Sequence, residues 1–309
     1  MPANPLLPSS SKKRNPNRMA KTKYTGVLVV ENFDQLDKFY ENGKLPTSTL
    51  GDSVKYYPNT YLVLKFNNKQ SALGKISPCG QWIFPLKGKK EYFDISPRNK
   101  EQVMLFDLLS NDTIKVVTVT GKAGTGKSLL IGAFITDQLM SNKVKKVVIS
   151  KPMEIVGNSK YFGTVPGNKD EKFDPFLLNF KYLFVKLAGE KGLSYFDAYV
   201  KKGLIEFMPL ELIRGVSFAD NTIVYLDEAQ NVDDHVIKTL GTRIGEESRL
   251  IISGDYNQVD VKTKDFKPGI MTVIDSEPFR KSPITGHLHL LKVERGPVAE
   301  LFAEIFGEE

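Results

Sequence analysis

The segment GKAGTGKS at residues 121–128 constrains the fold of this chain more than any other part of its sequence. It follows the apolar run KVVTVT at 115–120 and precedes the amphipathic segment SLLIGAFITDQLM at 128–140. A buried strand, a glycine-rich turn and a helix in this order form the strand–loop–helix unit of parallel α/β sheets. The sequence therefore predicts an α/β fold built around this loop.

The residue types in this loop suit the binding of a triphosphate. Gly121, Gly124 and Gly126 let the backbone turn tightly, so that successive N–H groups point at phosphate oxygens. The following helix adds the positive end of its dipole, Lys127 reaches the β- and γ-phosphates, and Ser128 offers a hydroxyl to Mg²⁺. The alternative is a glycine-rich turn with an exposed lysine. The expected nucleotide-binding residues are Gly121, Lys122, Ala123, Gly124, Thr125, Gly126, Lys127 and Ser128.

Two further polar groups follow apolar runs. Asp227 ends the run TIVYLD and is expected to hold Mg²⁺, while Glu228 is expected to polarise the attacking water. In SGDYNQVD, at 253–260, Asn257 and Gln258 are expected to face the γ-phosphate. The reason is that the strand before them, at 249–255, should lie between the strand that leads into the loop and the strand that ends at Asp227. The alternatives are an ordinary acidic strand end and a polar turn capped by Asp255. A glutamate beside Asp227 favours hydrolysis by water over a small-molecule kinase reaction.

From about Ile95 onward, apolar runs alternate with helical patterns, which predicts a parallel sheet with helical crossovers. Before it, short β-type runs separated by Pro, Gly or Asn predict a small β-rich domain, with a short helix that ends at Gly43. The expected strands are 25–30, 61–66, 72–76, 81–86, 115–120, 144–150, 204–208, 222–227, 249–255 and 287–293, and the expected helices of the second part are 100–109, 128–140, 233–244 and 297–306.

The leading residues 1–22 are rich in Lys, Arg, Pro and Ser, and we expect a disordered basic arm there. Such an arm either binds a polyanion or is a solvated tail. The expected organisation is an arm at 1–22, a small β-rich domain at 23–93 and the loop-containing α/β domain at 94–309.

The composition, 41% hydrophobic and 26% charged, is that of a globular protein, and its net charge of +7 permits a polyanionic partner. No apolar stretch approaches the roughly 18 residues of a membrane span, and no secretory signal is evident at the start. Cys79 is the single cysteine, which excludes a disulfide framework. We therefore expect a cytoplasmic protein without a membrane partner. His235, His287 and His289 lack metal-ligand spacing and are expected to be structural.

Together these motifs resemble the PhoH-like ATPases, the phosphate-starvation-inducible family. The resemblance covers about residues 94–305, and KYYPNTYLVL and KQSALGKI also resemble the small β domain of longer family members. Those members carry an N-terminal PIN nuclease domain, for which a basic arm of 22 residues is too short, so nuclease activity is not expected. Besides the loop, the matching segments are SPRNKEQ (96–102), VPGNKDEKFDPF (165–176), PLELIRG (209–215), LDEAQN (226–231), TRIG (242–245) and SGDYNQVD (253–260).

The resemblance implies a RecA-like P-loop NTPase core that hydrolyses ATP with Mg²⁺. It also implies single-stranded RNA or DNA as a partner and a ring-shaped homo-oligomer such as a hexamer. Gln102 matches a position that reads adenine through its amide, which has the required donor and acceptor, and Arg98 and Asn99 are expected to help form that pocket. The alternative for Gln102 is an exposed residue of a helix.

Arginines within these motifs are candidates for stabilising charge at the γ-phosphate. Arg243 is expected to act from a neighbouring subunit and Arg295 within its own chain, with Arg214 as a further candidate. The alternative for each is a solvated surface arginine. For nucleic acid, Lys151 and Pro152 lie where helicases place a backbone-binding loop, and the insertion 157–181 mixes lysines with aromatic residues. That insertion is equally compatible with a lid or an interface.

The expected function is thus an ATP hydrolase that moves on, or remodels, single-stranded nucleic acid, as an RNA helicase does. Because the chain has no recognisable second RecA-like domain, a neighbouring subunit would supply the other face of the motor. The alternative is a nucleotide-dependent switch or assembly module with slow hydrolysis and a protein partner.

Overall fold

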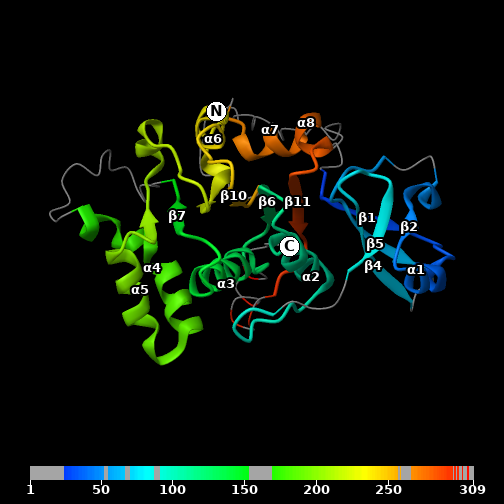
Figure 1. Cartoon of the computed structure of the whole chain (residues 1–309), viewed down its shortest axis with the longest axis horizontal. Helices are drawn as coiled ribbons and strands as arrows, with labels where there is room; N and C mark the ends of the chain where they lie inside the picture. The colour runs from blue at the N-terminus through cyan, green and yellow to red at the C-terminus, as the bar shows by residue number, and fades with distance from the viewer. Residues whose placement is uncertain are drawn as a thin grey trace, which may run out of the picture.

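A computed structural model of the chain describes residues 24–51, 55–66, 70–86, 91–152, 169–256, 258 and 266–294, and residues 296, 298, 301 and 305 beyond them. Of 169–177, 211 and 214 it describes the backbone alone. The expected arm at 1–22 and most of the expected closing helix at 297–306 lie outside the described residues. The described elements form two sheets that lie beside each other along the long axis of the molecule (Figure 1).

The larger sheet is parallel, with described strands in the order β11-β6-β10-β9-β7-β8. This confirms the α/β fold with a parallel sheet, and the apolar character of the strands follows from their burial on both faces. The strands are β6 (Val116–Gly121), β7 (Lys146–Ser150), β8 (Ile205–Phe207), β9 (Thr222–Leu226), β10 (Arg249–Gly254) and β11 (Thr285–Leu290).

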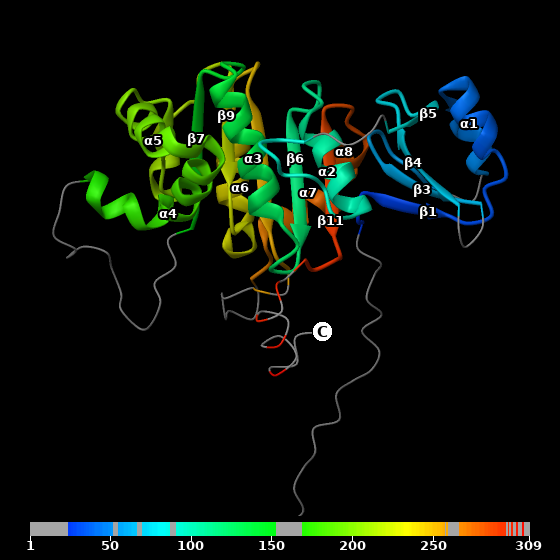
Figure 2. The same ribbon diagram turned by 90° about the horizontal axis from the view of Figure 1, so that it is seen from below.

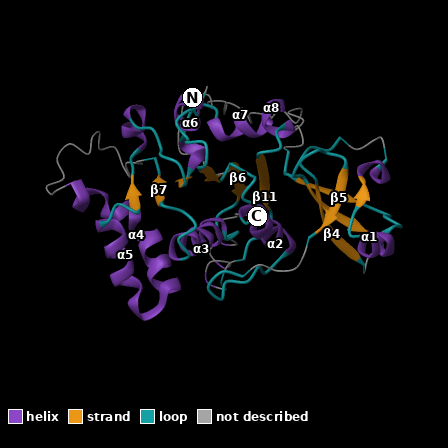
Figure 3. Cartoon of the chain, viewed as in Figure 1, coloured by secondary structure: helices purple, strands orange, loops and turns teal. Residues whose placement is uncertain are grey.

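Helices cover both faces of this sheet (Figure 3). One layer contains α2 (Lys100–Leu109), α3 (Lys127–Met140), α4 (Lys169–Ala188) and α5 (Gly192–Lys201), and the other contains α6 (Asp234–Gly241), α7 (Gly269–Asp275) and α8 (Glu277–Lys281). None of the helices in the described part of the chain is long and apolar enough to cross a membrane.

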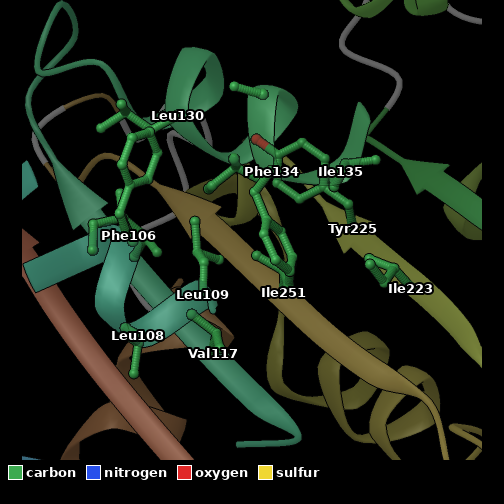
Figure 4. Close-up of a cluster of buried hydrophobic side chains, with 14 of the residues drawn as sticks. Phe106, Leu108, Leu109, Val117, Leu130, Phe134, Ile135, Ile223, Tyr225 and Ile251 are labelled. Carbon is green, nitrogen blue, oxygen red and sulfur yellow. The ribbon is translucent and has the colours of Figure 1, made fainter. Parts of the chain in front are cut away.

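Alternate residues of one strand supply the two cores between sheet and helices. On β9, Ile223 and Tyr225 belong to the cluster beneath α2 and α3, which Figure 4 shows. Val224 belongs to the cluster beneath α6 and α7. The central strands are therefore held from both faces, and their carboxyl ends have little freedom to move relative to one another.

The structure corrects one expected boundary and adds one helix. The last strand was expected at 287–293, but β11 ends at Leu290, because the N–H groups of Leu291 and Lys292 donate to the Glu101 carboxylate at 2.8 and 3.2 Å. The described part of the insertion 157–181, residues 169–181, belongs to α4, a helix that the sequence pattern did not predict. Phe180 and Phe184 of this helix pack on Phe196 of α5.

The smaller sheet has described strands in the order β1-β3-β4-β5-β2, with β1 parallel to β3 and the other pairs antiparallel. It is the β-rich region expected before the parallel sheet, while the boundary at residue 93 stays a prediction. A short helix ends at Gly43, which has the left-handed φ of 65° that favours glycine. The elements are β1 (Val27–Val30), α1 (Leu36–Asn42), β2 (Leu45–Pro46), β3 (Tyr61–Lys65), β4 (Ser71–Ile76) and β5 (Trp82–Pro85).

Buried hydrogen bonds join the two sheets beside β11. The side-chain amide of Asn59 donates to the carbonyl oxygens of Pro283 and Thr285, at 2.8 and 2.9 Å. Gly26 lies against the backbone of His287, where any Cβ would clash with the carbonyl oxygen of that histidine. These contacts place the start of the small sheet on the edge strand of the large one.

A second junction lies between the small sheet and α2. The Tyr61 hydroxyl and the Lys75 ammonium both donate to the Asp107 carboxylate, at 2.8 and 2.6 Å. Tyr61 is fully buried, so its hydroxyl needs this partner. Because α2 leads into the strand that carries the P-loop, the small sheet is packed on the same framework as the loop.

Replacing Asn59 by Ala should lower the free energy of unfolding by roughly 2–4 kcal/mol, because two buried carbonyls lose their donor. Asn59 also has a positive φ of 58°, which Ala adopts at a cost. The matched control is Asn142→Ala, at an exposed position with φ of 54°, which should cost only about 1 kcal/mol. Urea unfolding of both variants measures the difference, and equal losses would contradict the role assigned to Asn59.

Candidate functional site

The glycine-rich loop joins β6 to α3 at the carboxyl end of the parallel sheet (Figure 2). Two of its glycines are required by geometry. Gly121 has φ of 154°, and a Cβ there would lie 2.5 Å from the carbonyl oxygen of Leu290. Gly126 has φ of 91°, and a Cβ there would lie 3.1 Å from Nε2 of Gln102. At these two positions there is thus room for backbone only, which lets the loop turn tightly around a bound phosphate.

The ends of three strands meet at this loop, because β10 lies between β6 and β9. They enclose a cavity of about 260 Å³. The structure therefore brings together most of the residues expected to bind and hydrolyse the nucleotide. The lining residues are Ala123, Gly124, Gly126, Lys127, Ser128, Leu129, Asp227, Glu228, Gly254 and Gln258.

The Lys127 ammonium lies inside the loop, where it donates to the carbonyl oxygens of Gly121 and Lys122 at 2.6 and 3.0 Å. Burial lowers the pKa of Lys127, and the nearby carboxylates of Asp255, Asp227 and Glu228 oppose that shift. The three carboxylates thus help to keep the lysine charged, as an interaction with phosphate requires.

Asp227 and Ser128 both line this cavity. The hydroxyl of Tyr225 lies 3.0 Å from that of Ser253. The Asp227 carboxylate also accepts from the Ser253 hydroxyl at 2.5 Å and from the backbone N–H of Glu228 at 3.1 Å. A serine hydroxyl beside a carboxylate is a pair of hard oxygen ligands, which suits Mg²⁺ completed by phosphate and water. The residues present therefore fit the expected metal.

Glu228 has a left-handed backbone, with φ of 54° and ψ of 39°. Its carboxylate accepts from Nε2 of Gln230 at 2.7 Å, and the Lys151 ammonium lies 3.8 Å away. Gln230 is 2% exposed, and its Oε1 accepts from the backbone N–H of Asp255 at 3.0 Å. A non-glycine residue in this region is strained, and such strain persists where surrounding bonds hold it. Sequence reasoning missed Gln230, since no residue pattern signals a contact between two strand ends.

Asp255 lies at the end of β10 and is 4% exposed. Its carboxylate accepts from the backbone N–H of Ala123 in the phosphate-binding loop, at 2.9 Å. The sequence suggested only a turn cap for this residue. Gln258 follows it and lines the cavity, whereas Asn257 lies outside the described residues.

The segment before α2 lies beneath the loop. Gln102 is 4% exposed, so it is not the exposed helix residue of the alternative interpretation. Its Oε1 accepts from the backbone N–H of Arg98 at 2.8 Å, and its Nε2 donates to the carbonyl oxygen of Thr125 at 3.1 Å. Asn99 caps α2 by accepting from the N–H of Gln102 at 3.0 Å. Adenine recognition by Gln102 stays a prediction, and it would require some of these bonds to be exchanged.

The chain after β11 is held against the loop from the other side. The backbone N–H of Glu294 donates to the carbonyl oxygen of Gly124 at 2.9 Å. The Glu294 carboxylate accepts from Nδ2 of Asn99 at 3.0 Å. Sequence reasoning did not single out Glu294. Arg295, which follows it, lies outside the described residues.

The remaining candidate arginines lie apart from this cavity or are not described. The Arg243 guanidinium donates to the carbonyl oxygen of Thr239 at 3.0 Å, at the end of its own helix α6. Arg243 is not among the described residues that line the cavity, so its action on a neighbouring subunit stays a prediction. Of Arg214 the structure describes only the backbone.

The two histidines of β11 have structural surroundings. Nδ1 of His287 lies 2.9 Å from the Thr118 hydroxyl, and burial lowers the pKa of His287 to about 3. Nδ1 of His289 lies 2.8 Å from the Thr120 hydroxyl, and its ring stacks on Tyr256 at 5.6 Å. Both rings tie β11 to β6.

The chain is similar to known proteins over most of its length. The family described as PhoH-like protein matches residues 94–306. The chain is 37% identical over 296 residues to Protein PhoH2 of Bacillus subtilis (strain 168), a match that covers 91% of this chain and 64% of that protein. It is 32% identical over 238 residues to Protein PhoH2 of Mycolicibacterium smegmatis, and this match covers 77% of this chain and 53% of that protein.

Among solved structures, a SWI2/SNF2 ATPase core from Sulfolobus solfataricus in complex with dsDNA aligns with a TM-score of 0.39 and 14% identity. That alignment covers 64% of this chain and 39% of the other, and a similarity this low supports no conclusion by itself. The chain spans about half to two thirds of the length of the curated relatives described above. Because the family match extends over well more than half of the sequence and includes the loop at 121–128, the chain belongs to the PhoH-like protein family.

Proposed function

We propose that this protein hydrolyses ATP with Mg²⁺. One observation carries the proposal: Lys127, Ser128, Asp227, Glu228 and Gln258 all line one cavity at the ends of three parallel strands. Binding, metal-ligating and water-activating groups are thereby placed together, which is the arrangement that phosphoryl transfer to water requires.

Each residue has a distinct task in this proposal. Lys127 and the loop N–H groups bind the phosphates, and Ser128 and Asp227 would hold Mg²⁺, which neutralises charge on the phosphate oxygens. Glu228 orients water and accepts its proton, and Gln258 helps to place that water. The Asp255 carboxylate has to release the N–H of Ala123 before that group can bind phosphate.

The Lys127→Ala variant should lose hydrolysis by at least about a hundredfold and should bind ATP weakly, because the charge that faces the phosphates is removed. Phosphate release and fluorescent-nucleotide binding measure the two effects. Lys143→Ala is the matched control, since Lys143 is exposed beyond the far end of α3. Normal turnover in Lys127→Ala would refute the assignment of the site.

The Glu228→Gln variant should separate binding from hydrolysis. The amide oxygen can still accept from Gln230, but it cannot take a proton from water, so kcat should fall about 10²- to 10⁴-fold. The Kd for ATP should change little, because Glu228 binds no phosphate in this proposal. An unchanged kcat would exclude Glu228 as the base, whereas a lost affinity would point to a structural role.

We further propose that ATP hydrolysis is coupled to single-stranded RNA or DNA and that the protein acts as a homo-oligomer, in which a hexameric ring would let Arg243 reach a neighbour's nucleotide. The family resemblance and the net charge of +7 support this proposal. The division into an arm at 1–22, a small β-rich domain at 23–93 and an ATPase domain at 94–309 belongs to the same proposal.

One observation favours the alternative of a slow nucleotide-dependent switch with a protein partner. The N–H of Ala123 and the ammonium of Lys127 both bond to groups of the protein itself. Nucleotide binding must therefore rearrange the loop, and such a rearrangement is a natural element of a switch.

ATPase rates with and without single-stranded RNA, measured across a salt series, distinguish the two functions. For a nucleic-acid motor the rate should rise with RNA, and apparent affinity should fall steeply with salt, with a slope of about −0.7 per phosphate contact. Equal rates and no RNA binding would favour the switch. The mass of the particle in solution, measured on the same preparation, tests the proposed ring.

A further inference from the structure

The segment that follows β11 exposes an apolar stripe. The structure describes Val298, Leu301 and Ile305 as helical, and their spacing of three and four residues places them on one face of a helix. The three residues are 70%, 52% and 60% exposed. An apolar helix face is ordinarily buried against another element, so this C-terminal stripe is open to a partner.

An apolar groove lies between α6 and α7, which pack side by side over the large sheet (Figure 1). It has a volume of about 470 Å³, and β6 and β10 contribute to its floor. Gly241 lines it, and a Cβ at that position would meet nothing within 4 Å, so the groove is open there. We call it the α6–α7 groove. Its apolar lining residues are Val116, Ile237, Leu250, Ile252, Val273 and Phe279.

Polar groups of the α6–α7 groove favour an occupant that carries carboxylates. Lys238 lines the groove in the last turn of α6, and Arg243 lies just beyond that turn, whereas Asp234 lies at the other end of the helix. The buried Thr272 hydroxyl has no hydrogen-bond partner within the described part of the chain. The segment 297–309 contains four glutamates and no lysine or arginine. It can therefore supply acceptors to the basic end of the groove as well as apolar side chains.

The stripe and the groove belong to different parts of one chain. Val116 and Leu250 are register partners near the amino ends of β6 and β10, so the floor of the groove lies at the end of the sheet opposite the P-loop. The stripe begins only four residues after Glu294, whose N–H is bonded to the carbonyl oxygen of Gly124 in that loop. Its exposure shows that it does not fill the groove of its own chain. The same groove on a second copy is free of this constraint.

We propose that the C-terminal stripe of one copy docks into the α6–α7 groove of a second copy of this chain. An amphipathic helix laid in an apolar groove is a recurring mode of association between proteins. Because the two surfaces differ, the contact joins copies head to tail, and it closes into a ring when the rotation between copies fits. This proposal rests on the homo-oligomer proposed above and supplies its contact.

The contact would also complete the nucleotide cavity. Four residues span at most about 14 Å, so the stripe begins close to the P-loop of its own copy. Arg243 lies beside the groove, at the end of α6. A seated stripe therefore brings the Arg243 of the neighbouring copy toward the cavity of the copy that supplies the stripe. A guanidinium in that place would stabilise the charge on the γ-phosphate.

Leu301→Gln tests the stripe. Glutamine forms helices about as well as leucine but lacks its apolar surface, so the dissociation constant between copies should rise roughly 10- to 100-fold, as expected for one buried leucine. Sedimentation equilibrium of the full chain measures this constant. The matched control is Leu193→Gln on α5, where the leucine is 50% exposed and lies outside both surfaces. Thermal unfolding checks that both variants fold.

Cross-linking of mixed chains tests which surfaces meet. Cys79 is first replaced by Ser, since it is exposed and is the single cysteine of the chain. One protein then carries Leu301→Cys and a second, with a tag of different mass, carries Gly241→Cys. A short bismaleimide should join the two unlike chains. Leu193→Cys in place of Leu301→Cys should give no such product.

The ATPase rate tests the link to Arg243. At a protein concentration where Leu301→Gln is dissociated, its kcat should fall by the same factor as that of Arg243→Ala. The double variant should be no slower than either single variant, because both changes remove the same contribution. A dissociated Leu301→Gln protein with full activity would support the contact and refute the proposed action of Arg243.

Three outcomes separate this contact from the proposed oligomer. If the wild type is a monomer at every concentration, the homo-oligomer fails and the contact fails with it. If the wild type is an oligomer while Leu301→Gln keeps its mass and the unlike chains do not cross-link, this contact is excluded and the oligomer stands. If a chain that carries both cysteines cross-links only within itself, the segment covers the groove of its own chain and the proposal is wrong.

Discussion

The parallel pairing of β10 between β6 and β9 is the constraint on which the candidate site depends. It brings the phosphate-binding loop, Asp227 and Gln258 to one cavity, although Asp227 follows the end of the loop at residue 128 by 99 positions (227 − 128) and Gln258 by 130 (258 − 128). The strands are buried on both faces, so their carboxyl ends keep a fixed spacing. A slip of one residue in either pairing would exchange the two faces of a strand and leave polar groups in the core.

Hydrogen bonds hold the loop from three directions once the strands are in place. Asp255 binds the N–H of Ala123 from β10, Gln102 binds the carbonyl of Thr125 from beneath, and the N–H of Glu294 binds the carbonyl of Gly124. Only the first of these bonds occupies a group that a phosphate needs. The bond between Asp255 and Ala123 therefore competes directly with phosphate, as do the bonds from the Lys127 ammonium to the carbonyls of Gly121 and Lys122.

The small sheet shares this framework through two contacts of different kinds. The buried amide of Asn59 donates hydrogen bonds to the residues at the start of β11. Asp107 of α2 accepts hydrogen bonds from side chains of β3 and β4. Both β11 and α2 also adjoin the loop, through Leu290 and Gln102. The small sheet and the nucleotide cavity are therefore joined through elements that both of them contact.

The sequence by itself determined the parallel α/β core, the β-rich region before it and the residues of the cavity, because strands, glycine turns and helix starts are set by short-range patterns. It did not reveal α4, whose Phe180 and Phe184 pack on Phe196 of α5. Nor did it reveal that Gln102 is buried, that Gln230 holds Glu228, or that Asp255 contacts the loop. These are contacts between residues far apart in the chain, and only the strand order and packing of the tertiary structure decide them.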